Sequence, residues 1–191
     1  MNFLKLIKTR RSIRQFKQDF ISEEDLIDCV DTARLAPSAM NLQPLEYLLV
    51  TDKSQVAAIF PLLRWAGYIQ PHGNPKANRH PVAYLMILVN RQLSKQWSAY
   101  DIGAAVENCM LAAWSKGIGS CWLASIEREA IRKIYQIPEN YLIDSIVALG
   151  YPAEKPAIEP IEHDIKYWKD HLEQLHVPKR SLEQILHLNK F

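Results

Sequence analysis

Residues 101–125 read DIGAAVENCMLAAWSKGIGSCWLAS, and this stretch decides the fold. Its first part is typical of a long helix with Asp101 as the N-cap and with Gly117 and Gly119 at its end. The helix is apolar around much of its circumference, so it must be covered on more than one side. A sheet can cover one side and a second subunit another. The apolar positions are Ile102, Ala105, Val106, Cys109, Met110, Ala113 and Trp114.

The segment from Gly117 to Ser125 follows this helix and is rich in small residues. Small side chains let a flat ligand approach the backbone and leave main-chain N–H groups free to donate. The segment is not a dinucleotide fingerprint, because it lacks a third glycine and follows a helix rather than a strand. A Rossmann domain is therefore excluded here.

The chain on both sides of this stretch alternates between helical and strand patterns. Residues 22–25 form a capping box that opens a helix, and Pro37 stops it. The short apolar runs are rich in branched and aromatic residues, which suits strands buried on both faces of a sheet. We expect strands at 45–51, 82–90 and 145–150, further helices at 127–136 and 163–175, and a long loop at 67–81 that is either a substrate-side lid or a mobile surface segment.

The chain's size and charge bound its function. With 191 residues, an ordinary composition and no linker or repeat, we expect a single domain spanning 1–191. The 23 Lys and Arg residues nearly balance 21 Asp and Glu residues. This balance gives no general attraction to nucleic acid or an anionic membrane, so any anion site must be local.

Cysteine and histidine usage indicates a cytoplasmic protein without a metal site. Cys29, Cys109 and Cys121 lack disulfide or zinc spacing, and no HExxH motif is present. Neither a GxSxG elbow nor a phosphate-binding GxxxxGK loop occurs, which removes support for a serine hydrolase or a P-loop enzyme. The N-terminus has no signal-peptide pattern, and no apolar run approaches the about 20 residues needed to span a bilayer.

Two basic segments are candidate anion sites. In an extended segment Arg10, Ser12 and Arg14 point to the same side, where two guanidiniums and a hydroxyl can hold a terminal phosphate. The alternative is a solvated basic face. The second segment, Lys179 and Arg180 near the C-terminus, is either a second part of such a site or an exposed tail.

Residues 36–44 read APSAMNLQP and lie between the first helix and the first strand. The Ser, Asn and Gln side chains offer donors and acceptors that match the edge of a heteroaromatic ring. Pro, Ser and Asn are also the usual residues of a helix-to-strand turn. By themselves these residues leave both interpretations open.

The order of these segments resembles the nitroreductase family of flavoproteins. RRSIRxF is followed by APSAxNxQP, DIGAAxxN, GIGSCW, GYP and VPKR, so the resemblance extends over nearly the whole chain. It implies an α+β fold in which a central mixed β-sheet is flanked by helices. It also implies an intertwined homodimer with FMN at each subunit interface.

The resemblance also assigns site residues. It places the FMN phosphate at the N-terminal basic segment and the C-terminal Lys-Arg pair. It places the flavin ring at the APSAMNLQP segment, which reaches the ring across the dimer interface. It also places a backbone N–H group from the segment after GIGSC at the redox-active edge of the ring. The implied cofactor-binding residues are Arg10, Arg11, Ser12, Arg14, Pro37, Ser38, Asn41, Gln43, Trp122, Leu123, Ala124, Ser125, Lys179 and Arg180, with no catalytic side chain and no metal ligand.

The implied activity is a ping-pong reaction. NADH or NADPH reduces FMN and leaves, and a nitroaromatic, a quinone or another flat acceptor is then reduced at the same face. The alternative is an FMN-binding protein of the same fold with a different redox chemistry, or with a non-catalytic sensing or storage role. A nucleic-acid or partner-binding module is the third reading, and the near-neutral charge disfavours it. The physiological acceptor and the nicotinamide preference are not encoded in any segment we identify.

Overall fold

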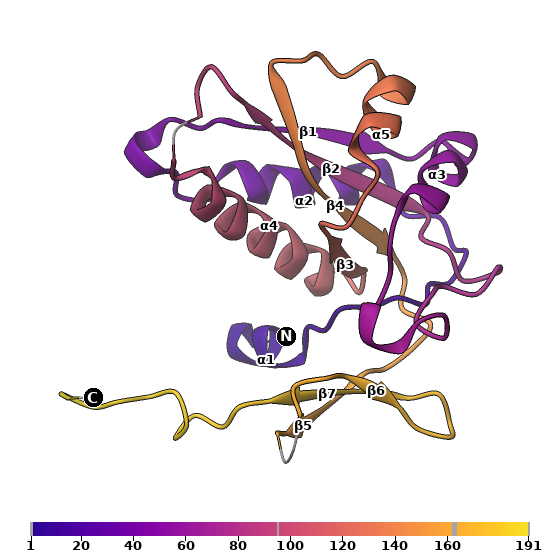
Figure 1. Cartoon of the computed structure of the whole chain (residues 1–191), viewed down its shortest axis with the longest axis vertical. Coiled ribbons are helices and arrows are strands. Elements are labelled where there is room, and N and C mark those ends of the chain that lie inside the picture. Colours follow the sequence, from indigo (N-terminus) through magenta and orange to yellow (C-terminus); the bar gives the residue numbers. More distant parts are fainter. Residues whose placement is uncertain (1, 95, 162–163, 191) are drawn as a thin grey trace.

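The computed structural model describes residues 2–94, 96–161 and 164–190. A central sheet carries helices on both of its faces, and a second, smaller sheet lies apart from it (Figure 1). The helices are α1 (Phe3–Thr9), α2 (Glu23–Arg34), α3 (Lys53–Ile59), α4 (Ser98–Ser115) and α5 (Arg128–Tyr135), with short 3-10 turns η1 (Ala39–Asn41), η2 (Phe60–Leu62) and η3 (Gly67–Ile69). The strands are β1 (Leu45–Val50), β2 (Ala83–Asn90), β3 (Gly119–Leu123), β4 (Tyr141–Gly150), β5 (Ala157–Pro160), β6 (Trp168–Lys169) and β7 (Leu175–Lys179).

The central sheet has the order β1-β2-β4-β3, and each of its three pairs of neighbouring strands is antiparallel. The expected mixed sheet is therefore wrong for the strands described. Within the described residues, parallel pairing at this sheet is limited to an isolated bridge between Ser12 and Ser120. An apolar run reveals that a strand is buried but not in which direction its neighbour runs, so the sequence pattern could not distinguish the two arrangements.

Strand β2 is buried on both faces, which explains its unbroken apolar run. Tyr84 and Met86 face a cluster that includes residues of α3 and α5, while Leu85 and Ile87 face a cluster with residues of α2 and α4. Successive side chains of a strand point to opposite faces, so a strand covered on both sides must be apolar at every position. The predicted strands are confirmed, with β4 beginning earlier than expected.

Helix α4 confirms the long apolar helix but begins at Ser98, with Trp97 at the N-cap. The expectation that Asp101 is the N-cap is wrong. Its carboxylate instead accepts hydrogen bonds from the Ser38 hydroxyl and the Ala39 backbone N–H, both at 2.9 Å. A carboxylate can cap the N–H groups of its own helix or those of a neighbouring loop, and sequence alone does not distinguish the two.

The small sheet has the order β5-β7-β6 and replaces the helix expected at 163–175. That expectation is wrong from residue 164 onward, and His163 lies outside the described residues. The Asp170 carboxylate accepts from the Leu172 and Gln174 N–H groups at 2.9 and 2.8 Å, which closes a turn between β6 and β7. The Trp168 ring then stacks on the His176 ring at 4.1 Å, so local turn chemistry and strand pairing outweigh helix propensity.

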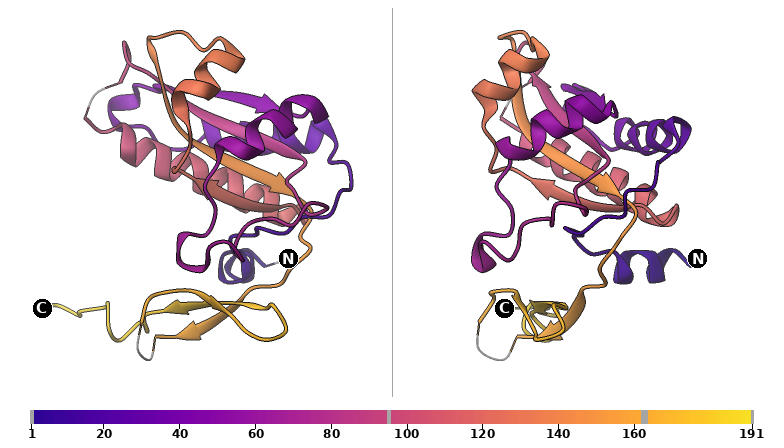
Figure 2. Two further views of the ribbon diagram at one scale, coloured as in Figure 1. Left: turned by 45° about the vertical axis from the view of Figure 1, so that its right-hand side comes forward. Right: turned by 90° about the vertical axis from the view of Figure 1, so that its right-hand side faces the viewer.

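The small sheet lies on the same side of the molecule as α1 in all views (Figures 1 and 2). The N-terminal segment therefore runs between the central sheet and the C-terminal part of the chain. The chain after β7 extends away from the body (Figure 1). Within the described residues, no helix combines the length and hydropathy needed to cross a membrane.

Candidate functional site

The N-terminal basic segment lies along the edge of β3. The backbone N–H of Ile13 donates to the carbonyl of Ser120 at 2.9 Å, and Ser12 forms the parallel bridge to Ser120. The approach is close, because a Cβ at Gly119 would stand 2.8 Å from Cγ1 of Ile13. The fold thus brings together two of the predicted site segments, which lie more than a hundred residues apart in the sequence.

Arg10, Ser12 and Arg14 present unused donors at this edge. The Arg10 Nε bonds Glu107 at 3.2 Å, and its terminal nitrogens make no hydrogen bond to the described residues. The Ser12 hydroxyl likewise has no partner there. The Nε of Arg14 is buried without a hydrogen-bond partner among the described residues. A buried donor without a partner is costly, and an anionic ligand would satisfy it.

Arg11 has a different environment from its neighbours. Its guanidinium donates to the backbone carbonyls of Lys8 and Arg10, at the C-terminal end of α1. Cationic side chains are favourable at this end of a helix, because the last carbonyls carry partial negative charge. In this chain Arg11 therefore closes α1.

The backbone after β3 carries the second group of donors. Trp122 directs its indole N–H to the Ser145 hydroxyl at 2.7 Å, and Leu123 is buried in the core. The N–H groups of Ala124 and Ser125 make no hydrogen bond to another described residue, while the Ala124 carbonyl is held by Arg128 at 3.0 Å. This short stretch is thus fixed in place with its N–H groups available.

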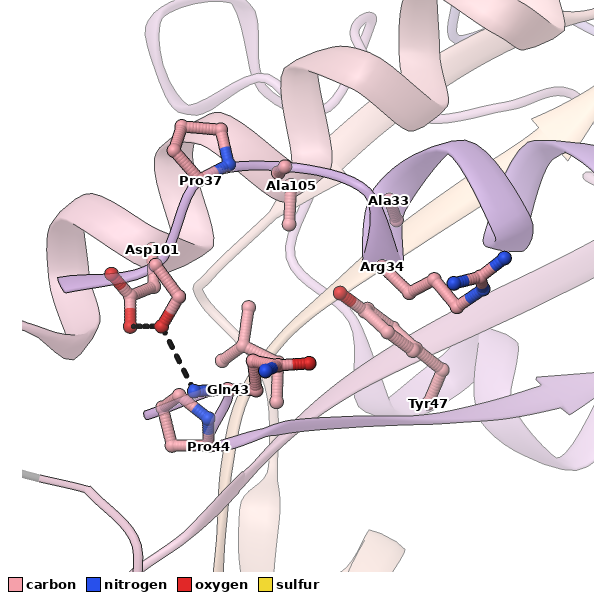
Figure 3. Close-up of a pocket in the computed structure, with 11 residues that line it drawn as sticks. Ala33, Arg34, Pro37, Gln43, Pro44, Tyr47, Asp101 and Ala105 are labelled. Atoms are coloured by element: carbon pink, nitrogen blue, oxygen red, sulfur yellow. Dashed lines mark hydrogen bonds between the residues drawn. The ribbon is translucent and has the colours of Figure 1, made fainter. Parts of the chain in front are cut away.

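The APSAMNLQP segment is a strained loop held by Asp101 (Figure 3). Ser38 donates to Asp101 and accepts from the backbone N–H of Gln43, and both distances are 2.9 Å. Met40, Asn41 and Gln43 all have positive φ, at 55°, 55° and 48°. For residues other than glycine such a conformation costs on the order of 1 kcal/mol each. The carboxylate and the hydroxyl offset this cost by anchoring the loop.

A small pocket of about 150 Å³ lies beneath the loop. Pro37 and Gln43 border it from the loop, Tyr47 from β1, and Ala105 from α4, as Figure 3 shows. Burial raises the pKa of the Tyr47 hydroxyl to about 12, so this group is neutral at physiological pH. The Gln43 amide donates to the Asn41 side chain at 3.1 Å, which joins the two amides that the sequence assigns to a ring edge.

Lys179 and Arg180 are not brought against Arg10 or Arg14 within this chain. Both are exposed, and Arg180 donates to the Gln184 carbonyl. The C-terminal part nevertheless reaches the N-terminal segment through Tyr167, whose ring lies 5.0 Å from the Arg14 guanidinium carbon. The joint phosphate site therefore stays a prediction, now with Tyr167 as a link between the two parts.

The long loop at 67–81 also lies against this region. The Tyr68 ring lies 5.0 Å from the Tyr167 ring, and the Arg64 N–H, just before the loop, donates to the Ser125 carbonyl at 3.0 Å. The sequence analysis did not identify either tyrosine as part of this region. It also expected Asp101 to cap its own helix, whereas its carboxylate bonds Ser38 and Ala39. No periodicity marks Tyr68 or Tyr167, because the contact joins two irregular segments far apart in the chain.

The cysteines and the candidate metal ligands are the last groups to consider. Burial raises the pKa of Cys121, although the nearby Arg14 acts in the opposite direction, and burial raises that of Cys29 to about 11. Such thiols are protonated and weak nucleophiles. Among the residues that the structure describes, no three His, Cys, Asp or Glu side chains gather as a metal site.

The comparison with known proteins settles the family. The model of the nitroreductase family matches residues 7–151. The chain belongs to the nitroreductase family. This membership confirms the predicted family and, with it, the general class of flavin-dependent oxidoreductases.

Three similar proteins each match at least four fifths of this chain and of their own length. A protein of Archaeoglobus fulgidus with the provisional name NADH dehydrogenase/NAD(P)H nitroreductase is 37% identical over 160 residues, which cover 80% of this chain and 86% of that protein. The iodotyrosine deiodinase of Thermotoga neapolitana is 29% identical over 177 residues, covering 85% of this chain and 95% of that protein. A provisionally named nitroreductase of Desulfovibrio desulfuricans, solved in complex with FMN, shares the fold with a TM-score of 0.74 at 20% identity, covering 100% of this chain and 98% of that one.

The site of this nitroreductase-family chain suits a flavin mononucleotide in its donor set. The buried Arg14 Nε without a partner, the free nitrogens of Arg10 and the Ser12 hydroxyl match a phosphate. The free N–H groups of Ala124 and Ser125 match the acceptor atoms of a flavin ring. The observed donors are therefore consistent with the cofactor that the sequence predicts.

Proposed function

We propose that this chain is an FMN-dependent NAD(P)H oxidoreductase that reduces nitroaromatics, quinones or similar flat acceptors. Bound FMN supplies two-electron redox chemistry, with reduction by the nicotinamide and reoxidation by the acceptor as separate half-reactions. The single observation that carries the proposal is the contact of the Arg10–Arg14 segment with Ser120 of β3, the strand that leads into the backbone at 122–125. The nitroreductase name of the Archaeoglobus relative supports the choice of NAD(P)H and acceptor.

The chain's own residues would bind FMN and orient its ring. Arg10, Ser12 and Arg14 would hold the phosphate, with Lys179 and Arg180 as further cations. The N–H groups of Ala124 and Ser125 would donate to the ring, where a fixed donor favours the electron-rich reduced form. The remaining expected contacts around the ring are Pro37, Ser38, Asn41, Gln43, Trp122 and Leu123. Arg11, which bonds the carbonyls at the end of α1, would add positive charge near the phosphate.

The functional unit in this proposal is an intertwined homodimer. Large apolar side chains are exposed on α1 and on the chain after β7, including Phe3 and Leu188, which are 66% and 79% exposed. Exposed apolar surface on this scale indicates a protein partner. A second copy would bury it and would bring the loop at 37–43 of one subunit toward the flavin of the other, as the family resemblance implies.

The test is the visible spectrum of the purified protein with saturating FMN, recorded without oxygen before and after NADH or NADPH is added. We expect a flavin spectrum that one or both nicotinamides bleach and that a quinone or nitroaromatic restores. A protein that neither binds FMN nor gains thermal stability from it would contradict the proposal. The rates with the two nicotinamides would show which one is preferred.

A second candidate is an FMN protein of the same fold with another redox chemistry. The similarity to a protein named iodotyrosine deiodinase favours it, because that name denotes removal of a halogen from a phenol, a different reaction from nitroreduction. Reoxidation by a halogenated phenol, but not by quinones or nitroaromatics, would favour this candidate. An FMN complex that neither nicotinamide bleaches would favour the non-catalytic sensing or storage role.

A further inference from the structure

Both carboxylate oxygens of the buried Asp101 accept hydrogen bonds from the loop at 37–43. It is 5% exposed and lies in the first turn of α4. Its two oxygens accept from the Ser38 hydroxyl and the Ala39 N–H, both at 2.9 Å, and no described cation pairs with it. A buried charge without a counter-ion requires such donors, and the positive end of a helix adds to its stabilisation.

The carboxylate also sets the direction of the next hydrogen bond. Because an ionised carboxylate only accepts, the Ser38 hydroxyl must give its proton to Asp101. The lone pairs of Ser38 are then free to accept from the Gln43 N–H at 2.9 Å. One chain of hydrogen bonds thus runs from α4 through Ser38 to the far end of the loop (Figure 3).

This chain holds the part of the loop that is least favourable by itself. Three of the four residues from Met40 to Gln43 adopt left-handed backbone conformations, and none of them is glycine. Without the anchor these residues would return to ordinary conformations. The amides of Asn41 and Gln43 would then lose their relative placement.

We infer that Asp101 is a positioning residue for the flavin ring, and this inference rests on the proposed function. It acts through Ser38 on the backbone that presents Asn41 and Gln43, without touching the cofactor itself. Asp101→Asn preserves the size of the side chain but replaces one acceptor by an N–H donor. The amide oxygen can still accept from the Ala39 N–H, but an uncharged N–H group then faces Ser38. The two hydrogen bonds to a carboxylate are thereby replaced by weaker neutral ones, and the loop anchor is weakened.

The test compares the binding of FMN and of riboflavin, which lacks the phosphate, to the full-length protein. We expect Asp101→Asn to weaken both by the same factor, about tenfold or more, because the effect is on the ring. Ser38→Ala should also weaken the binding of both flavins. The double variant should bind each flavin as tightly as the single variant with the lower affinity, since both changes break one hydrogen-bond chain. Asp28→Asn is the matched control, because Asp28 bonds Lys116 at 2.8 Å on the surface and does not touch the loop.

Three outcomes decide the inference. If Asp101→Asn binds both flavins like the unmodified protein, if its loss is confined to FMN, or if the two substitutions are additive, the inference is wrong while the proposed function stands. If the unmodified protein does not bind FMN, the proposed function fails and the inference with it. Should Asp101→Asn not fold by circular dichroism, Asp101→Ser takes its place: equal losses for both flavins support the inference, and unchanged binding overturns it.

Discussion

At the scale of single residues, three half-buried side chains of one segment have different partners. Arg10 bonds Glu107, Arg14 lies over Tyr167, and Ser12 has no side-chain partner among the described residues. Each of the three keeps at least one donor without a hydrogen-bond partner among the described residues, on a segment whose backbone lies along β3. Sequence alternation predicts that these three side chains share one side of the segment and that Arg11 does not.

We predict that Arg14→Gln selectively weakens FMN binding. The substitution removes the charge and the fork of donors that suit a phosphate, so FMN affinity should fall about tenfold to a hundredfold while riboflavin affinity changes little. Fluorescence titration with both flavins measures this difference. Arg91→Gln, at an exposed turn after β2, is the control; equal losses for both flavins in Arg14→Gln would contradict a phosphate contact.

We predict that Gly119→Ala separates the N-terminal segment from β3. The new methyl would lie 2.8 Å from Cγ1 of Ile13 and 3.0 Å from Cγ of Pro152, closer than atoms pack. Overpacking of this kind costs about 1–3 kcal/mol, and we expect FMN affinity to fall together with stability. Thermal melts with and without FMN measure both effects.

Gly67→Ala is the matched change for that prediction, because nothing lies within 4 Å of its added Cβ. We expect it to melt close to the unmodified protein. If Gly119→Ala behaved like Gly67→Ala in stability and in FMN binding, the close approach of the two segments would not matter for the site.

At the scale of elements, one histidine contacts several parts of the small sheet. The His176 ring contacts Glu159 of β5 through Nδ1 and Asp170 through Nε2, the latter at 3.3 Å, and stacks on Trp168. Partial burial lowers the pKa of His176, but the hydrogen bonds to the two carboxylates raise it by more. The protonated ring therefore joins three parts of the sheet.

We predict that this sheet loosens as the pH rises. Because the folded pKa lies above the unfolded value of about 6.5, the stabilisation is fully present below that value and is lost as the pH rises through the folded pKa. Hydrogen exchange at 157–160 and 175–179, corrected for intrinsic rates, should show less protection at about pH 8.5 than at about pH 5.5. His176→Gln should abolish the difference; equal protection of the unmodified sheet at both values would refute the role of the ring.

At the scale of the whole molecule, the chain after β7 lies outside the body and exposes several large apolar side chains. Leu182, Ile185, Leu186 and Leu188 are all more than half exposed, and Figure 1 shows this segment extending away from the central sheet. A single subunit provides no cover for it. The predicted homodimer would.

We predict that ending the chain at Ser181 converts a dimer into a monomer. The truncation removes those four apolar side chains but keeps Lys179 and Arg180, so any loss of FMN affinity does not come from losing the two cations expected at the phosphate. Light scattering of the full-length and truncated proteins gives the masses, and circular dichroism confirms folding. A truncated protein that stays dimeric and retains full FMN affinity would contradict the role of this segment.

The sequence by itself determined the features that depend on near neighbours. The cap at Ser22, the buried strand at 82–90 and the apolar α4 each follow from spacing along a few turns or residues. The ordered motifs added the family, which the comparison confirms. These properties are local, so they survive without knowledge of the tertiary contacts.

Only the tertiary structure decided which distant groups meet. The antiparallel order of the central sheet, the contact of Asp101 with Ser38, the approach of Tyr167 to Arg14 and the small sheet in place of a helix all join segments that share no sequence pattern. A buried carboxylate or an apolar strand needs a partner, but its sequence does not say which one. That choice depends on the packing of the whole chain, where many alternatives of similar local energy compete.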